Sequence, residues 1–265
     1  MKEDKILVNG IKVTYKIAGE GPAILVLHGW GGSSDSWVRI LRILSKQGYT
    51  LLVPDLPGFG KTPPPYDPWS VGDYMEFLSC FLEEIKEKEK SFVSPFFLLG
   101  HSFGGRVSIK FCVKHPENVR KLILLDSAGI KPKHEWQGFK GFLIFSAAAI
   151  GNALFTPKVM LRFKDGVRNF FYKMIRNRDY AKADGIMKDT VKKVLYEDLL
   201  PELPHLRQET LIIWGDKDKM VPLKYAHIFN KNINNSRLEI LKDAGHSPHL
   251  ECPETLAEHI KNFFH

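Results

Sequence analysis

Short apolar runs alternate with longer amphipathic segments along most of the chain. The apolar runs have no polar face, which is typical of strands that are buried on both sides. Strands are predicted for Ala23–Leu27, Thr50–Val53, Phe96–Leu99, Lys121–Leu125, Thr210–Trp214 and Arg237–Leu241. Helical spacing of apolar positions predicts helices over Ser36–Gln47, Ser70–Lys90, Ser102–His115 and Pro253–Phe264, and one from about Pro222. Alternating strands and helices predict a mostly parallel sheet with helices on both faces.

The N-terminal residues follow a different pattern. Ile6–Val8 and Lys12–Ile17 flank Asn9-Gly10, a pair that favours the tight turn of a β-hairpin. We therefore expect an antiparallel hairpin before the first buried strand. Asp35 precedes the first helical segment and is a candidate N-cap, because its carboxylate can accept from the free N–H groups of a first helical turn.

The alternation stops after residues 126–129 and resumes near residue 210. Residues 131–205 have helix-like patterns, many aromatic and basic side chains and no clear strand. This break predicts an insertion into the α/β pattern. We expect an α/β core made of residues 1–130 and 206–265, with a helical cap or lid over residues 131–205.

The turn between the strand at residue 96 and the next helix carries the clearest chemical signal. Gly100-His-Ser-Phe-Gly104 has the spacing of a turn that lifts a serine clear of a sheet. The helix that follows points free N–H groups toward the site, where they can stabilise an oxyanion. A serine hydroxyl is a weak nucleophile until a base takes its proton, so Ser102 needs partners.

Three other segments supply candidate partners. Asp216 and Asp218 follow the strand at residue 210, and His246 and His249 follow the last strand. All four come after the carboxyl ends of predicted strands, which meet at one edge of a parallel sheet. The Gly-rich turn over residues 28–32 follows another strand and offers a second N–H for an oxyanion.

Taken together, these motifs resemble those of the α/β-hydrolase superfamily over essentially the whole chain. The matching segments are His28-Gly-Trp-Gly-Gly, Asp55-Leu-Pro-Gly-Phe-Gly, Gly100-His-Ser-Phe-Gly-Gly, Trp214-Gly-Asp-Lys-Asp and Gly245-His-Ser-Pro. They look most like the small-cap branch that holds carboxylesterases, meta-cleavage-product hydrolases, proline iminopeptidases and non-haem haloperoxidases. The resemblance implies an α/β-hydrolase fold with a mostly parallel eight-stranded sheet and an inserted helical cap.

The resemblance also implies roles for individual residues. Ser102 would be the nucleophile, Asp218 the acid and His246 the base. The backbone N–H groups of Trp30 and Phe103 would form the oxyanion hole. Trp30, Phe142 and Phe145 are candidates for the wall of an apolar substrate pocket, and the alternative is that the aromatic cap residues form the cap's own core.

Several neighbouring residues are rivals or supports for these roles. Asp216 competes with Asp218 but is better suited to capping its turn, and Asp126 competes because some relatives place the acid after the sixth strand. His249 competes with His246. Among the supports, we expect His28 and His101 to bond backbone groups. Asp55 should hold its loop together through side-chain-to-backbone hydrogen bonds.

A serine nucleophile narrows the reaction class. Relatives that act on haloalkanes and epoxides use aspartate at this turn, whereas serine favours acyl transfer. The main prediction is a carboxylesterase-type serine hydrolase for short to medium acyl esters, acting through an acyl-enzyme. One alternative is a C–C bond hydrolase of dienoic keto-acids, whose carboxylate would meet cap arginines: Arg162, Arg168, Arg176 and Arg178. A non-enzymatic ligand-binding module is the other alternative.

Charge limits the classes of partner. The net charge is +8, and residues 131–207 hold 15 Lys and Arg against 8 Asp and Glu. We interpret this excess as a solvated basic face, and a positive field that attracts acidic substrates is the alternative. Because no recognition motif accompanies the charge, we expect a small-molecule ester or acidic carbonyl substrate and no nucleic acid.

Other compositional features bear on location and cofactors. Three scattered cysteines favour a reducing compartment, so we expect a cytoplasmic protein. Residues 1–5 begin no apolar segment, and residues 142–155 fall short of the roughly 20 needed to cross a bilayer, so neither signal peptide nor membrane span is expected. Metal-ligand and phosphate-loop spacings are missing from the sequence, so we expect no metal and no other cofactor. The expected assembly is a monomer or homodimer.

Overall fold

The computed structural model describes residues 1–131 and 183–264. The chain divides into two compact units, one made of Met1–Lys131 and Ile186–His265 and the other of Pro132–Gly185. The first unit holds the sheet. Residues 186–205, which the sequence pattern placed in the cap, belong to this first unit, whereas most of the expected cap lies outside the described residues.

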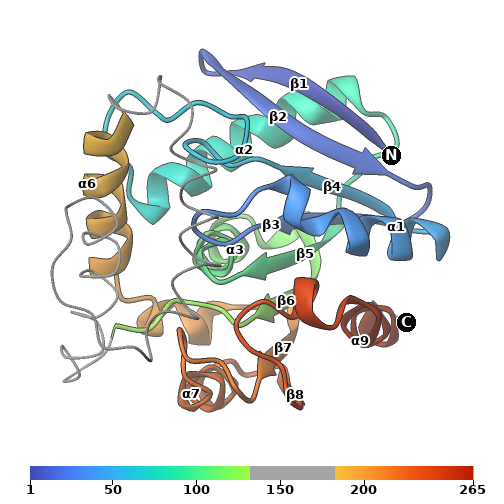
Figure 1. Ribbon diagram of the computed structural model, residues 1–265, viewed down its shortest axis with the longest axis vertical. Coiled ribbons are helices and arrows are strands. Elements are labelled where there is room, and N and C mark those ends of the chain that lie inside the picture. The colour runs from blue at the N-terminus through green and yellow to red at the C-terminus, as the bar shows by residue number, and fades with distance from the viewer. Residues whose placement is uncertain (132–182, 265) are drawn as a thin grey trace, which may run out of the picture. The chain divides into compact units, whose positions relative to one another are not determined.

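One sheet runs through the first unit in the order β1-β2-β4-β3-β5-β6-β7-β8 (Figure 1). Its strands are β1 Lys2–Val8, β2 Ile11–Ala18, β3 Ala23–Leu27, β4 Thr50–Pro54, β5 Phe96–His101, β6 Val119–Leu125, β7 Glu209–Gly215 and β8 Ser236–Leu241. The β1–β2 and β2–β4 pairs are antiparallel, and the other pairs are parallel. The predicted hairpin and the mostly parallel eight-stranded sheet are therefore confirmed.

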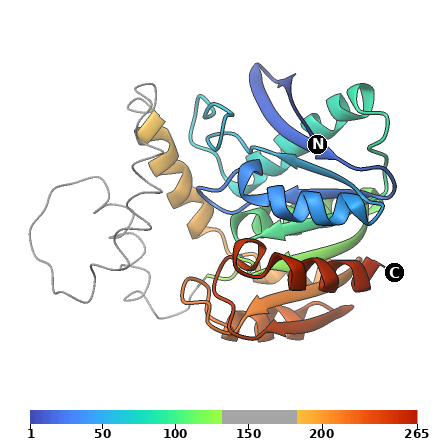
Figure 2. The same cartoon turned by 45° about the vertical axis from the view of Figure 1, so that its right-hand side comes forward.

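Helices cover both faces of the sheet (Figures 1 and 2). Helices α1 (Val38–Lys46) and α9 (Pro253–Phe264) pack on one face, while α2 (Val71–Lys88), α3 (Phe103–Lys114) and α7 (Lys224–Asn232) pack on the other. The chain also forms α6 (Ala183–Tyr196) and the short α8 (Pro248–Glu251). Within residues 1–131 and 183–264, no helix combines the length and hydrophobicity that crossing a bilayer requires.

Alternate side chains along the strands pack into two separate hydrophobic cores, one on each face of the sheet. In β3, Ala23, Leu25 and Leu27 pack under α2 and α3, while Ile24 and Val26 pack under α1 and α9. Successive side chains of a strand point to opposite faces, so a strand with helices on both sides must be apolar throughout. This is why the buried strands show no polar alternation in sequence.

The start of α1 differs from the prediction. Ser34–Trp37 form a 3₁₀ turn, α1 begins at Val38, and no side chain caps it. Asp35 instead pairs with the nearly buried ammonium of Lys16, at 2.7 Å. A buried charge needs a partner more than a helix end needs a cap, because water can satisfy the exposed N–H groups of a helix terminus.

The register of the parallel strands aligns their carboxyl ends. Paired residues at or near these ends are Leu27 with Gly100, His101 with Leu125, Leu125 with Ile213, and Gly215 with Leu241. Residues that directly follow β3, β5, β6, β7 and β8 therefore meet at one edge of the sheet. All the candidate chemistry of the sequence lies after these strands.

Candidate active site

Ser102 occupies a strained turn between β5 and α3. Its backbone angles are φ 52° and ψ −111°, in a region that non-glycine residues rarely adopt. Three backbone hydrogen bonds of 3.1 Å hold the turn: Ser102 N–H donates to Leu125 O, and Ser102 O accepts from the N–H groups of Gly105 and Ala128. A Cβ at Gly104 would lie 2.8 Å from the carbonyl oxygen of His28, so only glycine fits there.

Three predicted residues form a continuous chain of hydrogen bonds. Ser102 Oγ lies 3.0 Å from His246 Nε2, and His246 Nδ1 lies 2.7 Å from Asp218 Oδ2. Because a carboxylate only accepts hydrogen bonds, Nδ1 carries the imidazole proton and Nε2 accepts from the serine hydroxyl. The His246 side chain is 12% exposed, and that of Asp218 is fully buried.

The turn after β7 fixes the Asp218 carboxylate. Its Oδ1 accepts hydrogen bonds from the N–H groups of Met220 (2.7 Å) and Val221 (2.9 Å). Oδ2 is left for His246. Two N–H donors on one oxygen set the orientation of the carboxylate.

The Gly-rich turn after β3 lies directly against Ser102. A Cβ at Gly29 would lie 3.2 Å from Ser102 Cβ and 2.8 Å from His101 Nδ1. The next residue is Trp30, whose N–H has no hydrogen-bond acceptor among the described residues. Phe103 is the first residue of α3, where backbone N–H groups have no partner within the helix. Of the two residues predicted to supply oxyanion-hole N–H groups, Phe103 thus follows the serine directly, and Trp30 follows the glycine that lies against it.

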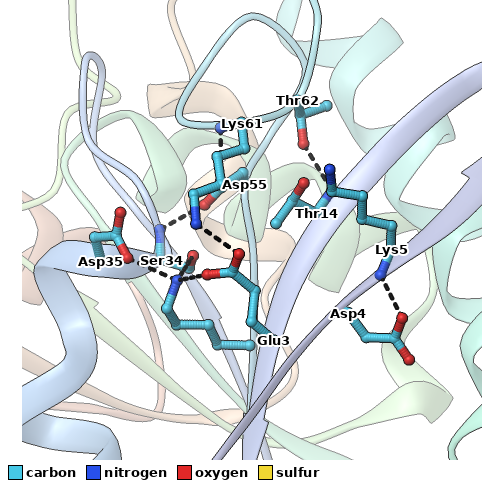
Figure 3. Close-up of polar contacts among 10 residues, drawn as sticks. Glu3, Asp4, Lys5, Thr14, Ser34, Asp35, Asp55, Lys61 and Thr62 are labelled. Atoms are coloured by element: carbon cyan, nitrogen blue, oxygen red, sulfur yellow. Dashed lines mark hydrogen bonds and ion pairs between the residues drawn. The ribbon is translucent and has the colours of Figure 1, made fainter.

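Side chains tie this turn to the loop after β4. His28 Nδ1 donates to Gly29 O (2.8 Å), and His28 Nε2 accepts from Leu56 N–H (3.0 Å). The carboxylate of Asp55 accepts from the N–H groups of Ser34 (2.7 Å) and Lys61 (2.8 Å), as Figure 3 shows. The expected backbone contacts of His28 and Asp55 are confirmed, and they join two loops that the sequence leaves separate.

Two further histidines support the site from behind. His101 Nε2 donates to the carbonyl oxygen of His246, at 2.7 Å, as expected for a residue that bonds backbone. His249 stacks on Trp37, with ring centroids 4.4 Å apart, and is 3% exposed. Burial lowers the pKa of His249 to about 3 and, with the nearby imidazoles, lowers that of His101 well below its usual value. Both rings are therefore neutral. His249 packs on Trp37 and makes no hydrogen bond to Ser102.

The rival acids lie in different places. Asp216 is exposed, and its N–H donates to Leu241 O. Asp126 is buried at the end of β6 and accepts from Gly215 N–H at 2.9 Å. One ligand atom each of Asp126, Asp218 and His246 lie within 4.8 Å of one another, a spacing that could hold a metal ion. Since Asp218 and His246 already bond each other, we interpret this group as part of the hydrogen-bonded chain.

Aromatic side chains line the region beside the serine. Trp30 is half-buried and packs edge-to-face on Phe59 (4.8 Å between centroids) and Phe103 (5.3 Å). This contact gives the candidate oxyanion turn an apolar wall. Phe142 and Phe145, the other candidates for substrate contact, lie outside the described residues, as do the four cap arginines.

Sequence reasoning missed the links across long separations. His101 and His246 are 145 residues apart, and Asp126 and Gly215 are 89 apart. The sequence offered only weak evidence for these two contacts. A histidine in the serine turn and an aspartate after a strand occur in many other structural roles.

The chain is similar in sequence and in fold to several known proteins. The sequence model described as the Alpha/beta hydrolase family matches residues 24–259. Lipase 1 of Psychrobacter immobilis is 28% identical, over 97% of this chain and 82% of that protein. Monoacylglycerol lipase ABHD6 of Mus musculus is 28% identical, over 92% of this chain and 76% of that protein. The crystal structure of a membrane phospholipase A, a bacterial virulence factor, aligns with a TM-score of 0.78 at 25% identity, over 99% of this chain and 85% of that chain.

Proposed function

Because the chain belongs to the alpha/beta hydrolase family, we propose that it is a serine hydrolase that cleaves carboxylic esters with short to medium acyl chains. The observation that carries the proposal is the unbroken path from Ser102 Oγ through His246 to Asp218. A half-buried serine in a strained turn with a paired imidazole is the arrangement that acyl transfer needs.

The first half of the proposed reaction forms an acyl-enzyme. Ser102 Oγ attacks the ester carbonyl carbon while His246 Nε2 takes the hydroxyl proton. Asp218 stabilises the resulting imidazolium through Nδ1–H. The N–H groups of Trp30 and Phe103 hold the negative charge that develops on the carbonyl oxygen. The C–O bond then breaks, and the imidazolium gives its proton to the leaving alcohol.

The second half returns the free enzyme. Water enters the site, gives a proton to His246 Nε2 and attacks the acyl carbon. The Ser102 ester bond breaks, the serine regains its proton, and the carboxylic acid leaves. The same groups act in both halves, so loss of any one of them should slow both halves.

The relatives support an ester as substrate. Two of those compared are named as lipases, one of them for monoacylglycerols, and the aligned structure is a phospholipase. These substrates all carry an apolar acyl chain on a carboxylic ester. The half-buried Trp30 on Phe59 and Phe103 would contact such a chain. We propose in addition that the region inserted after β6 forms a cap that selects the substrate.

Two alternative functions are tested by the same assay as the proposed ester hydrolysis. Dienoic keto-acids would be cleaved at a C–C bond by the same serine, and the arginines that would recognise them lie outside the described residues. A ligand-binding module would bind without turnover. The geometry around Ser102 favours turnover, since a strained turn costs stability that packing does not require.

The test is hydrolysis of p-nitrophenyl esters with short, medium and long acyl chains by the wild type and by Ser102→Ala. We expect a clear chain-length optimum and a loss of about 10⁴-fold or more in kcat for the variant. Ser127→Ala is the matched control, because Ser127 lies in the same region but outside the hydrogen-bonded chain. Ester turnover equal in wild type and Ser102→Ala would contradict the proposal. Turnover of dienoic keto-acids alone would select the C–C hydrolase.

A further inference from the structure

Asp126 is held between two strands beside the proposed reaction centre. It directly follows β6, has a φ of 42° and is fully buried. Its N–H donates to Ile213 O and its Oδ1 accepts from Gly215 N–H, both at 2.9 Å. These two bonds attach its backbone and its carboxyl group to β7, the strand that leads into Asp218.

The second carboxyl oxygen of Asp126 is not explained by these contacts. Oδ2 is buried and has no hydrogen-bond partner within the described part of the chain. Atoms of Asp126, Asp218 and His246 gather within 4.8 Å. A buried polar atom normally has a hydrogen-bond partner, and the neighbouring Asp218 carboxylate is the acceptor to which a protonated Oδ2 could donate.

Two carboxyl groups this close in a buried site cannot both carry a negative charge. Asp218 has the better set of donors for the anion, with two backbone N–H groups and His246. Asp126 has one N–H donor, from Gly215. Burial, and then the negative charges of Asp218 and Glu251, outweigh that donor and raise the pKa of Asp126 to about 9. Asp126 therefore keeps its proton at neutral pH.

We propose that Asp126 is a positioning residue for this reaction: an un-ionised carboxyl group that steadies the Asp218 carboxylate opposite His246 and replaces it as the acceptor for His246 when Asp218 is removed. The inference rests on the proposed serine hydrolase function. The replacement follows from electrostatics: burial is the main reason that Asp126 keeps its proton, and removing the charge of Asp218 removes the repulsion that adds to it, so that Asp126 ionises at a lower pH. The ionisable neighbours of Asp126 then include His246, whose N–H favours its anion, and Glu251 of α8, which opposes it. They also include Cys252, whose thiol has its pKa raised by burial and by nearby carboxylates, Asp126 among them.

The first experiment compares ester hydrolysis by Asp126→Asn, Asp218→Ala and the double variant. Asparagine keeps an acceptor for Gly215 N–H and offers an N–H donor to Asp218. We expect Asp126→Asn to lower kcat by about threefold to tenfold, because an amide N–H is a weaker donor to Asp218 than a carboxylic acid, with KM and the pH profile between about pH 6 and 8 as in the wild type. Asp218→Ala should keep on the order of 10⁻² of kcat, with activity that rises as Asp126 ionises. The double variant should fall at least about tenfold further.

Two outcomes overturn the inference. If Asp126→Asn loses as much activity as Asp218→Ala, Asp126 is itself the charged acid. If Asp218→Ala and the double variant are equally active and share one pH profile, Asp126 does not replace Asp218. Thermal unfolding of each variant identifies loss of folding, and Asp126→Ser is a second, smaller replacement that removes the carboxyl group.

A spectroscopic readout separates this inference from the proposed function. The Nδ1–H proton of His246 gives a low-field NMR signal when it bonds a carboxylate, and its absence in His246→Gln assigns it. We expect the signal in wild type, in Asp126→Asn and, at higher pH, in Asp218→Ala, but not in the double variant. Absence of the signal from Asp218→Ala at every pH overturns the inference, even if no ester is turned over. Equal turnover by wild type and Ser102→Ala contradicts only the proposed function.

Discussion

At the residue scale, the site depends on groups whose charge state is set by burial. His101 and His249 lie behind His246, both neutral, and each has a depressed pKa. Neutral rings at these positions leave His246 as the histidine that bonds Ser102. The same burial makes folding sensitive to acid, because the unfolded chain can protonate these rings and the folded chain cannot.

A test of this link is His249→Phe, which keeps the stacking on Trp37. The folded pKa of His249 is about 3, below the ordinary value of 6.5, so the unfolded state binds the extra proton between these two pH values. Stability is complete above the upper value and is lost as pH falls. The free energy of unfolding should decline by up to about 1.4 kcal/mol per pH unit for this one group.

Urea unfolding at a series of pH values between 7 and about 4 measures this slope. The variant should show the shallower slope, and His227→Phe, at an exposed histidine, should keep that of the wild type. Equal slopes for wild type and His249→Phe would show that His249 is protonated in the folded state.

At the element scale, a capping side chain fixes the start of a helix when that side chain would otherwise be bonded only to water. Helix α2 begins at Val71 because Ser70 and Asp73 form a reciprocal capping box: Ser70 Oγ accepts from Asp73 N–H (3.2 Å), and Asp73 Oδ2 accepts from Ser70 N–H (2.7 Å). Helix α1 has no such cap, because Asp35 is drawn away by Lys16. A cap therefore forms only where tertiary contacts leave its side chain free.

The capping box predicts a measurable effect of Ser70→Ala. The variant loses the acceptor for Asp73 N–H, and we expect the free energy of unfolding to fall by about 1 kcal/mol. Urea unfolding at neutral pH checks it. Ser91→Ala, at an exposed position between α2 and β5, should change the stability by less than about 0.5 kcal/mol. A loss no greater than that of the control would mean that water replaces the side chain fully.

At the scale of the whole molecule, the net charge and the candidate site residues lie in different parts of the sequence. The candidate site gathers residues that lie between His28 and His246 in the sequence, whereas residues 131–207 hold nearly all of the net charge of +8. A net positive charge attracts anionic substrates over distances limited by the Debye length. Such a field would affect the rate of substrate encounter rather than the bond-breaking step, whereas a solvated basic face would affect neither.

This leads to a prediction about salt. The kcat/KM for an ester that carries a free carboxylate should fall several-fold as NaCl rises from about 10 mM to about 500 mM. A neutral ester of similar size should change little, and a choline ester should change in the opposite direction. Initial rates at low substrate concentration measure all three. The same salt response for anionic and neutral esters would show that the charge is only a solvated face.

The sequence by itself determined the strand pattern, the helix cover and the identity of most candidate residues. Apolar runs, helical spacing and glycine turns are local properties, and physics acts on them within a few residues. Ser102, the two aspartates Asp216 and Asp218 and the two histidines His246 and His249 could be named as candidates because each follows a predicted strand, and carboxyl ends of parallel strands meet at one edge. The choice of Asp218 and His246 among them rested on the resemblance to the α/β-hydrolase motifs.

Only the tertiary structure decided how these side chains act on one another. Strand register brought Asp126 to Gly215, burial made His249 a stacked neutral ring, and Lys16 drew Asp35 away from α1. Hydrogen bonds, desolvation and charge pairing depend on distance in space, and the partners here are separated by many residues. The sequence pattern cannot decide between possible partners of a side chain, because each pairing depends on which other side chains are buried beside it.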